Sequence, residues 1–284
     1  MRKSLITTAV LGALAAPSFA LAADAAPAPA PAPAPDLTVA YNVGLYSQYI
    51  FRGLTQTNRQ PALQGGVDLT HSSGFYLGAW GSNISWLRDK IGTSQDSVYT
   101  SGGSLELDLY GGYRADFKGI GIDVGALQYW YPGKVRKPGQ SDANTTEVYG
   151  AISYGWLQGK ISSVVSKDAW GFGKEYNVSS GGDDERGTYY AELNANIPLA
   201  DTGITALIHV GRQEFNNAKV SFTGPAASYT DWKLGLTKAF NSGINVGAYY
   251  TDTNISNANA ADNWTYAGKN IGDSTGTVFV QKAF

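Results

Sequence analysis

The chain has 284 residues, a formal net charge of −2 and no cysteine. Charged residues make up 15% of it, below the roughly 25% of ordinary soluble domains, whereas Gly, Tyr and Trp number 35, 18 and 7. This composition excludes a disulfide framework. It also argues against nucleic-acid binding, because proteins that bind nucleic acid usually carry a basic patch.

Residues 1–22 have the three parts of a secretory signal peptide. Arg2 and Lys3 give a positive start, an apolar stretch follows, and Ala20-Leu21-Ala22 matches an A-x-A cleavage site. A single transmembrane anchor is the alternative, but the apolar stretch is short and is interrupted by Pro17. We therefore expect export and cleavage, which leaves 19 basic and 23 acidic residues and a net charge of −4.

Residues 23–36 form a linker in which Ala and Pro nearly alternate. Proline fixes φ and lacks an amide donor, so neither helix nor sheet can form there. The segment should be extended, at about 3.1 Å per residue. We interpret it as a passive periplasmic spacer. The alternative is a segment that extends toward a periplasmic partner such as the cell wall.

From residue 37 to residue 284, apolar and polar residues alternate with a period of two. This period is typical of strands whose two faces meet different surroundings. Most segments reach the roughly 9–11 residues that a tilted transmembrane strand needs. Twelve segments are expected, at 38–53, 61–71, 75–86, 103–115, 120–132, 144–155, 160–169, 187–197, 204–214, 228–240, 244–253 and 275–284.

The connections between these segments alternate in length. Short turns are expected at 72–74, 116–119, 156–159, 198–203 and 241–243, and longer polar loops at 54–60, 87–102, 133–143, 170–186, 215–227 and 254–274. Outer-membrane barrels have short periplasmic turns and long external loops. We therefore predict an all-β fold, a transmembrane up-and-down antiparallel β-barrel of about 12 strands. A soluble β-sandwich is the alternative, but it does not predict this asymmetry.

The last segment is expected to close the barrel. Val278, Val280 and Phe284 alternate toward one face, and Phe284 should lie beside the first strand near Leu37. A terminal aromatic residue resembles the assembly signal of bacterial outer-membrane barrels, which implies the barrel-assembly machinery as a partner during insertion. Lys282 interrupts the apolar row, although a lysine can extend its amine to the interface.

The strand faces opposite the leucines should line the lumen, since charge on the lipid face is costly. These side chains would form either a selectivity lining or a salt-bridge network that fills the lumen. The acids outnumber the bases, which hints at a preference for cations. The candidate pore-lining residues are Arg52, Asp68, Glu106, Asp108, Arg114, Asp123, Glu147, Lys160, Glu192, His209 and Lys233.

No motif for catalysis or for a cofactor is found. His71 is expected at an exposed turn and His209 in the lumen, and two histidines without cysteine or an H-x-x-x-H spacing do not predict a zinc site. No nucleophile elbow or phosphate-binding glycine motif is present. The acids at 183–185 do not have the spacing of a calcium loop. We expect neither an enzyme nor a bound cofactor.

Four short segments, at 42–53, 56–57, 61–66 and 74–83, resemble the N-terminal signature of the TorF family of porin-like proteins. That proteobacterial family is otherwise of unknown function and offers no catalytic or binding residues. The resemblance implies a barrel in the lipid of the outer membrane of a Gram-negative bacterium. The predicted function is passive diffusion of small hydrophilic solutes or ions. The alternatives are a closed barrel whose loops 170–186 and 254–274 bind a partner, and a membrane enzyme that uses His209.

Overall fold

The structure is a computed structural model that describes residues 11–12, 14–15, 36–92, 96–136, 142–171, 184–216, 227–256 and 264–284. Two short strands, β1 (Leu11–Gly12) and β2 (Leu14–Ala15), pair with each other. The predicted signal peptide and linker lie almost wholly outside the described residues, so both stay predictions. In the part of the chain that the structure describes, no helix is long and apolar enough to cross a membrane.

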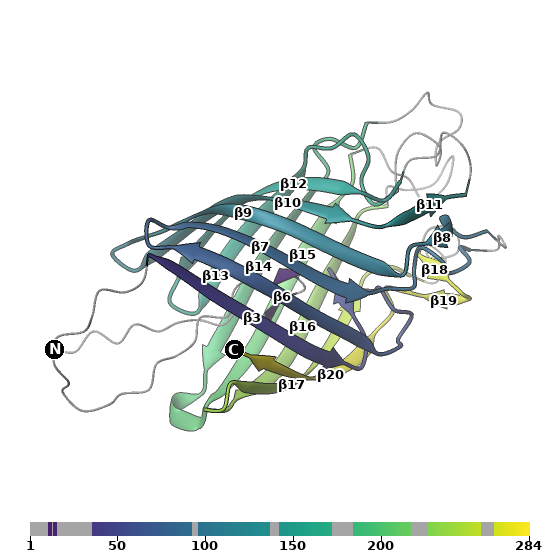
Figure 1. Cartoon of the computed structure of the whole chain (residues 1–284). Coiled ribbons are helices and arrows are strands. Elements are labelled where there is room, and N and C mark those ends of the chain that lie inside the picture. The colour runs from purple at the N-terminus through teal and green to yellow at the C-terminus, as the bar shows by residue number, and fades with distance from the viewer. Residues whose placement is uncertain are drawn as a thin grey trace, which may run out of the picture.

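Twelve antiparallel strands form a closed barrel, in which each strand pairs with its neighbour in sequence and the last pairs with the first (Figure 1). The prediction of a twelve-stranded up-and-down barrel is therefore confirmed. The strands are β3 (Leu37–Tyr46), β6 (Ala62–His71), β7 (Phe75–Asn83), β9 (Leu105–Phe117), β10 (Ile120–Trp130), β12 (Thr145–Tyr154), β13 (Leu157–Val164), β14 (Tyr189–Pro198), β15 (Ile204–Glu214), β16 (Tyr229–Ala239), β17 (Ile244–Thr253) and β20 (Thr275–Ala283).

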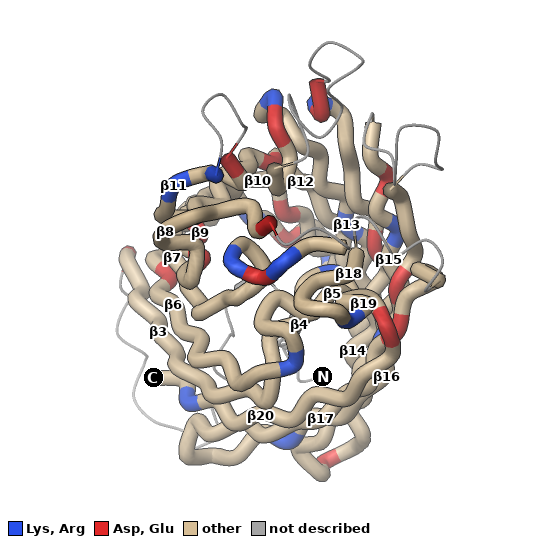
Figure 2. Tube along the Cα trace, turned by 90° about the vertical axis from the view of Figure 1, so that its right-hand side faces the viewer, with Lys and Arg blue, Asp and Glu red and all other residues tan. Residues whose placement is uncertain are grey.

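The shorter elements lie in the connections. A 3-10 helix, η1 (Ala200–Thr202), forms one of the short turns. Figure 1 shows the longer loops gathered at the opposite end of the barrel, and Figure 2 looks into that end, with β4 and β5 inside the ring of barrel strands. The paired short strands are β4 (Ile50–Phe51) with β5 (Leu54–Thr55), β8 (Tyr99–Gly102) with β11 (Gly133–Val135), and β18 (Thr265–Tyr266) with β19 (Lys269–Asn270).

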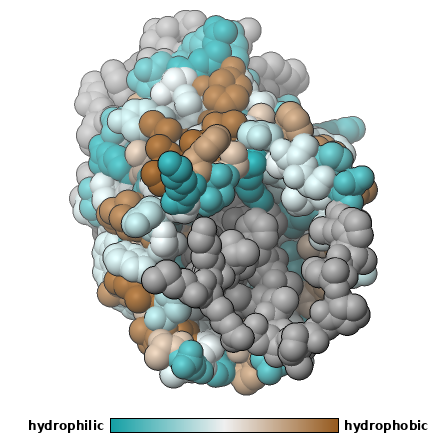
Figure 3. Space-filling model, turned by 90° about the vertical axis from the view of Figure 1, so that its left-hand side faces the viewer, coloured by the Kyte–Doolittle hydropathy of each residue, from teal (hydrophilic) through white to brown (hydrophobic). Residues whose placement is uncertain are grey.

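Each barrel strand has an apolar outer face and a more polar inner face. In β9, Leu105 and Leu109 are 41% and 55% exposed, whereas Glu106 and Asp108 are 1% and 2% exposed. Exposed apolar side chains recur on every strand of the barrel. Figure 3, which views the end with the short turns, shows hydrophobic residues around the flank of the barrel. An apolar outer face of this kind is what a lipid environment requires.

Two of the predicted strands have wrong boundaries. The first strand ends at Tyr46, not at 53, because the chain turns inward there. Arg52 (φ 46°) and Gly53 (φ 81°) take left-handed backbone angles in the turn that joins β4 to β5. The seventh strand is β13, at 157–164 rather than 160–169. Gly155, with φ 57°, begins the turn, so the connection is two residues long and Tyr154 pairs with Leu157.

The last strand closes the barrel by pairing with β17 on one side and with β3 on the other. Val278 and Val280 lie on its outer face, 60% and 46% exposed. Phe284 follows the strand, and its N–H donates to the Tyr41 carbonyl at 2.9 Å. At this seam Ala283 pairs with Asn42, so Phe284 lies beside Tyr41 and not beside Leu37, because the strands of a closed barrel are staggered.

Candidate functional site: the barrel lumen

Ten of the eleven predicted lumen residues lie on barrel strands and point inward. Some are nearly fully buried in the wall and others line a cavity in the lumen. The structure places these side chains inside the barrel, and their part in lining a pore stays a prediction. They are Asp68 on β6, Glu106, Asp108 and Arg114 on β9, Asp123 on β10, Glu147 on β12, Lys160 on β13, Glu192 on β14, His209 on β15 and Lys233 on β16.

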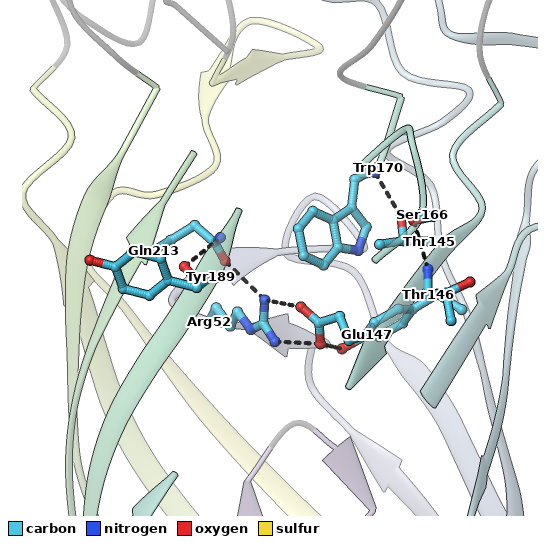
Figure 4. Close-up of polar contacts among 9 residues, drawn as sticks. Arg52, Thr145, Thr146, Glu147, Ser166, Trp170, Tyr189 and Gln213 are labelled. Atoms are coloured by element: carbon cyan, nitrogen blue, oxygen red, sulfur yellow. Dashed lines mark hydrogen bonds and ion pairs between the residues drawn. The ribbon is translucent and has the colours of Figure 1, made fainter. Parts of the chain in front are cut away.

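Arg52, the eleventh, was predicted on a strand but lies in the loop between β4 and β5. We call residues 47–61 the inward loop, since β4 and β5 lie within the ring of barrel strands (Figure 2). Arg52 bonds Glu147 on β12 at 2.8 and 2.9 Å and Gln213 on β15 at 2.9 Å. Figure 4 shows Arg52 between these two residues. The guanidinium therefore ties the inward loop to two separate parts of the wall.

The surroundings of Arg52 keep it charged. Its guanidinium carbon lies 4.4 Å from the centre of the Tyr190 ring, 4.8 Å from that of Phe51 and 5.2 Å from that of Trp170. Arg52 belongs to a loop and not to a membrane-spanning strand. Burial alone would lower the pKa of its guanidinium, but the negative charge of Glu147 raises that pKa above its ordinary value. The negative charge of Glu147 therefore offsets the cost of burying this guanidinium.

His209 is part of a second polar cluster, on β14, β15 and β16. Its Nε2 lies 3.0 Å from Asp231 Oδ2, and its Nδ1 lies 2.7 Å from Asn194 Oδ1. The Tyr190 hydroxyl donates to Asp231 Oδ1 at 2.8 Å and lies 2.9 Å from His209 Nε2. The hydroxyl group next to the His209 imidazole therefore belongs to Tyr190, and it donates its hydrogen bond to the Asp231 carboxylate.

A third cluster joins β7, β9, β10 and β12. Arg114 Nε donates to Asp123 Oδ2 at 2.8 Å, and its guanidinium carbon lies 3.9 Å from the centre of the Tyr76 ring. The Tyr76 hydroxyl donates to Asp123 Oδ1 at 2.6 Å and also contacts the hydroxyl of Tyr149. Tyr110, also on β9, donates its hydroxyl to Asp68 on β6 at 2.7 Å. Tyrosines therefore satisfy many of the inward carboxylates.

The two lysines of the lumen each lie near a tyrosine ring. Lys160 Nζ is 4.5 Å from the centre of the Tyr149 ring, and Lys233 Nζ is 5.4 Å from that of Tyr249. Both lysines line the cavity. Contacts of this kind are worth about 0.5–2 kcal/mol, so the rings hold the amines near the wall while leaving them able to meet a solute.

A cavity of about 160 Å³ lies between the inward loop and the polar wall. Its lining includes Arg52 and Gly53 of the loop together with residues of β6, β9, β10, β12 to β17 and β20. A cavity of this size holds a molecule about as large as benzene. Because charged, amide and tyrosine side chains line it, the cavity suits a small polar solute or an ion.

Aromatic residues of the longer loops and of β16 form a chain of ring contacts with Phe51 of the inward loop. Trp170 lies 5.8 Å from Phe51 and 6.3 Å from Phe215, measured between ring centres. Trp264 continues the cluster, 6.1 Å from Phe215 and 5.4 Å from Tyr229. We call these five residues the aromatic cap. Together with the inward loop, the aromatic cap narrows the lumen at the end with the long loops.

Several residues of these clusters were not predicted. Asp231 could have been found, because it stands two residues before Lys233 in an alternating segment. Tyr190, Asn194 and Gln213 could have been found in the same way, because the first two stand two residues from Glu192 and Gln213 stands four residues after His209. In the described residues, no group of three or more His, Asp or Glu side chains is arranged to hold a metal ion.

Comparison with solved structures gives distant matches to porins. The NanC porin is 8% identical, with a TM-score of 0.49, over 87% of this chain and 99% of that one. The KdgM porin is 9% identical, with a TM-score of 0.46, over 87% of this chain and 98% of that one. The outer membrane protein OprD from Pseudomonas aeruginosa is 11% identical, with a TM-score of 0.37, over 87% of this chain and 65% of that one.

Comparison of sequences shows the family. None of the curated proteins matches the chain, and the predicted TorF membership stays a prediction. The model of Gcw_chp, a family described as a bacterial protein of unknown function, matches residues 30–284. Since this match covers most of the sequence, the chain belongs to the Gcw_chp family.

Proposed function

We propose that the protein is a porin-like channel of the outer membrane, through which small hydrophilic solutes or ions diffuse passively without a cofactor. The observation that carries the proposal is a cavity with charged side chains in its lining, inside a closed barrel whose outer wall is apolar. Lipid would cover the outer wall. A membrane barrel with charged side chains on its inner face offers water and ions a path that the surrounding bilayer does not.

The inward loop sets the size of solute that this channel would admit. It lies within the ring of strands and forms part of the lining of the cavity of about 160 Å³. Permeation should therefore fall steeply for solutes larger than a few heavy atoms. Swelling of liposomes that hold the purified chain, measured with neutral solutes of increasing size, tests this. Entry of the smallest solutes supports the channel, and swelling no faster than in protein-free liposomes contradicts it.

One observation favours a second candidate, a barrel whose lumen is blocked and whose external loops bind a partner. The Arg52–Glu147 ion pair and the aromatic cap both lie across the end with the long loops. In this case the wild-type protein would not conduct, whereas a variant that frees the inward loop would. The same liposomes, prepared with Arg52→Gln, separate the two candidates. Swelling with the variant but not with the wild type favours the barrel with a blocked lumen.

A further inference from the structure

We infer that two lysines on the outer wall, Lys238 and Lys282, bind the phosphate groups of acidic phospholipids at the end of the barrel with the short turns. The inference goes beyond the proposed channel and does not depend on it, since it concerns the outer face of the barrel. It starts from a repeat in the sequence. Lys-Ala-Phe occurs twice, at 238–240 where β16 ends and at 282–284 where β20 ends.

The two copies of this triplet make the same backbone contacts. Ala239 donates its N–H to the Gly203 carbonyl at 3.0 Å, and Ala283 donates its N–H to the Gly243 carbonyl at 2.9 Å. Each glycine ends the short turn before the neighbouring strand, with φ of 67° and 77°. The repeat in sequence is therefore also a repeat in structure, and each lysine stands beside a turn of the same kind.

The turns hold the two amines in the same way. Lys238 Nζ donates to the Thr202 carbonyl, and Lys282 Nζ donates to the Ser242 carbonyl. In both cases the acceptor is the residue just before the glycine of the turn. An ammonium group has three donors, so one such bond fixes the amine and leaves two donors for a ligand.

Both lysines lie on the lipid side of the wall. Lys238 stands two residues after Leu236, which is 53% exposed on the outer face of β16, and Lys282 stands two residues after Val280, which is 46% exposed on that of β20. Each is the last outward residue of its strand. Its amine therefore reaches the level of the lipid headgroups rather than the hydrocarbon.

An exposed phenylalanine accompanies each amine. Phe240 and Phe284 are 46% and 63% exposed. Lys238 Nζ lies 5.8 Å from the centre of the Phe240 ring, and Lys282 Nζ lies 5.2 Å from that of Phe284. A ring face attracts a cation but supplies no negative charge. The rings therefore position the amines without neutralising them.

Neither amine has an acidic partner in the protein. None of the ion pairs among the described residues includes Lys238 or Lys282. Asp201, next to Thr202, is exposed and belongs to none of these pairs either. Both lysines are half-buried, so an anion from outside the protein would compensate their charge. On the lipid side of the wall, that anion is a headgroup phosphate.

The surface between the two lysines suits a lipid rather than a soluble phosphate. In the register of the sheet, Lys238 pairs with Val246 and Lys282 pairs with Ile244, both on β17. These two apolar side chains are 36% and 39% exposed. One strand thus separates the amines, and the strip between β16 and β20 is roughly 10 Å wide. Acyl chains would cover the strip. A headgroup with net negative charge is favoured, because a zwitterionic one carries its own cation.

The test is the lipid selectivity of the full chain in vesicles, measured by electron paramagnetic resonance with spin-labelled phosphatidylglycerol and phosphatidylcholine. We expect the wild type to prefer phosphatidylglycerol. The double variant Lys238→Gln/Lys282→Gln should lower this preference by about twofold or more. Lys118→Gln is the matched control. Lys118 lies in an exposed turn at the same end, between β9 and β10, and should leave the preference unchanged.

Equal association of the wild type with both lipids would overturn the inference. An unchanged preference in the double variant, or an equal loss in Lys118→Gln, would do the same. Inorganic phosphate should displace the labelled lipid no more than chloride of equal ionic strength does, and stronger displacement would mean that the amines bind soluble phosphate instead. If the double variant does not insert, the single variants replace it. Each should lose part of the preference, and no loss in either would count against the site.

Discussion

Arg52 and Glu147 form two hydrogen bonds, of 2.8 and 2.9 Å, although 95 residues separate them in the sequence. Their side chains are 4% and 1% exposed. This ion pair therefore lies inside the barrel and fastens the inward loop to β12. A buried ion pair is costly to break, because the partner that remains is left as an uncompensated charge.

The first prediction is that Arg52→Gln destabilises the barrel and increases its conductance. Loss of the guanidinium leaves Glu147 buried and unpaired, which should cost about 3–5 kcal/mol unless the loop moves. Movement of the loop would widen the lumen. The measurements are thermal unfolding in detergent and conductance in a planar bilayer.

The control for this variant is Arg59→Gln, in the same loop. Arg59 pairs with Asp273 at 3.6 Å, and the two side chains are 34% and 56% exposed. An exposed pair of this kind contributes about 0–1 kcal/mol. Equal effects of the two variants on stability and conductance would show that the Arg52–Glu147 pair does not hold the loop.

The second prediction is that Gly53→Ala displaces the inward loop. Gly53 has φ 81°, and an added Cβ would lie 2.5 Å from the Asp231 Cβ and 2.7 Å from the Thr253 Cγ2. Backbone strain of about 1–3 kcal/mol would add to this overlap. Thermal unfolding should show a clear loss of stability and bilayer recordings an altered conductance.

Gly119→Ala provides the comparison for that experiment. Gly119 has a similar φ of 89°, but nothing lies within 4 Å of an added Cβ there. Its substitution should therefore cost only the backbone strain and leave the conductance unchanged. If both variants behave alike, close packing of Gly53 against β16 and β17 does not position the loop.

The third prediction concerns the outer wall. Leu234 lies in the middle of β16 and is 50% exposed, next in sequence to the inward Lys233. Leu234→Lys should lower the stability of the barrel in lipid by about 2–4 kcal/mol, because the charge would face the hydrocarbon. Gln158→Lys, in the cavity lining, adds the same charge on the inner face. A smaller loss for Leu234→Lys than for Gln158→Lys would contradict the assignment of the faces.

The fourth prediction is that deletion of Phe284 slows assembly without changing the conductance of molecules that do assemble. Phe284 donates its N–H to Tyr41 and stacks on the Tyr41 ring at 5.4 Å between centres. The deletion removes both contacts at the seam of the barrel. Phe284→Tyr keeps both and serves as control in a time course of folding into lipid vesicles. Equal folding rates for the deletion and the control would show that Phe284 has no role in assembly.

The sequence predicts the wall of the barrel well, because one face of each strand meets lipid and the other does not. Glu106 and Asp108 alternate with leucines, and this alternation alone places them inside. A period of two therefore predicts both that a strand is present and which face of the sheet each side chain lies on. The hydrogen-bond partners of these carboxylates do not follow from it.

The inward loop shows what local pattern could not predict. Tyr49, Ile50 and Phe51 have high strand propensity, so residues 47–53 were assigned to the first strand. In the structure, long-range contacts override this pattern, since Arg52 bonds residues 95 and 161 positions further along the chain. The turn near residue 155 was missed for a simpler reason. Either Gly155 or Gly159 could take a positive φ, and the sequence does not distinguish them.

The most direct test of the proposed channel is a planar-bilayer recording of the purified full chain at several salt concentrations. A narrow open channel should give small, discrete conductance steps that grow with salt concentration. Arg52→Gln should give larger steps under the same conditions. Protein that inserts as a folded barrel but shows no step at any salt concentration would contradict the channel.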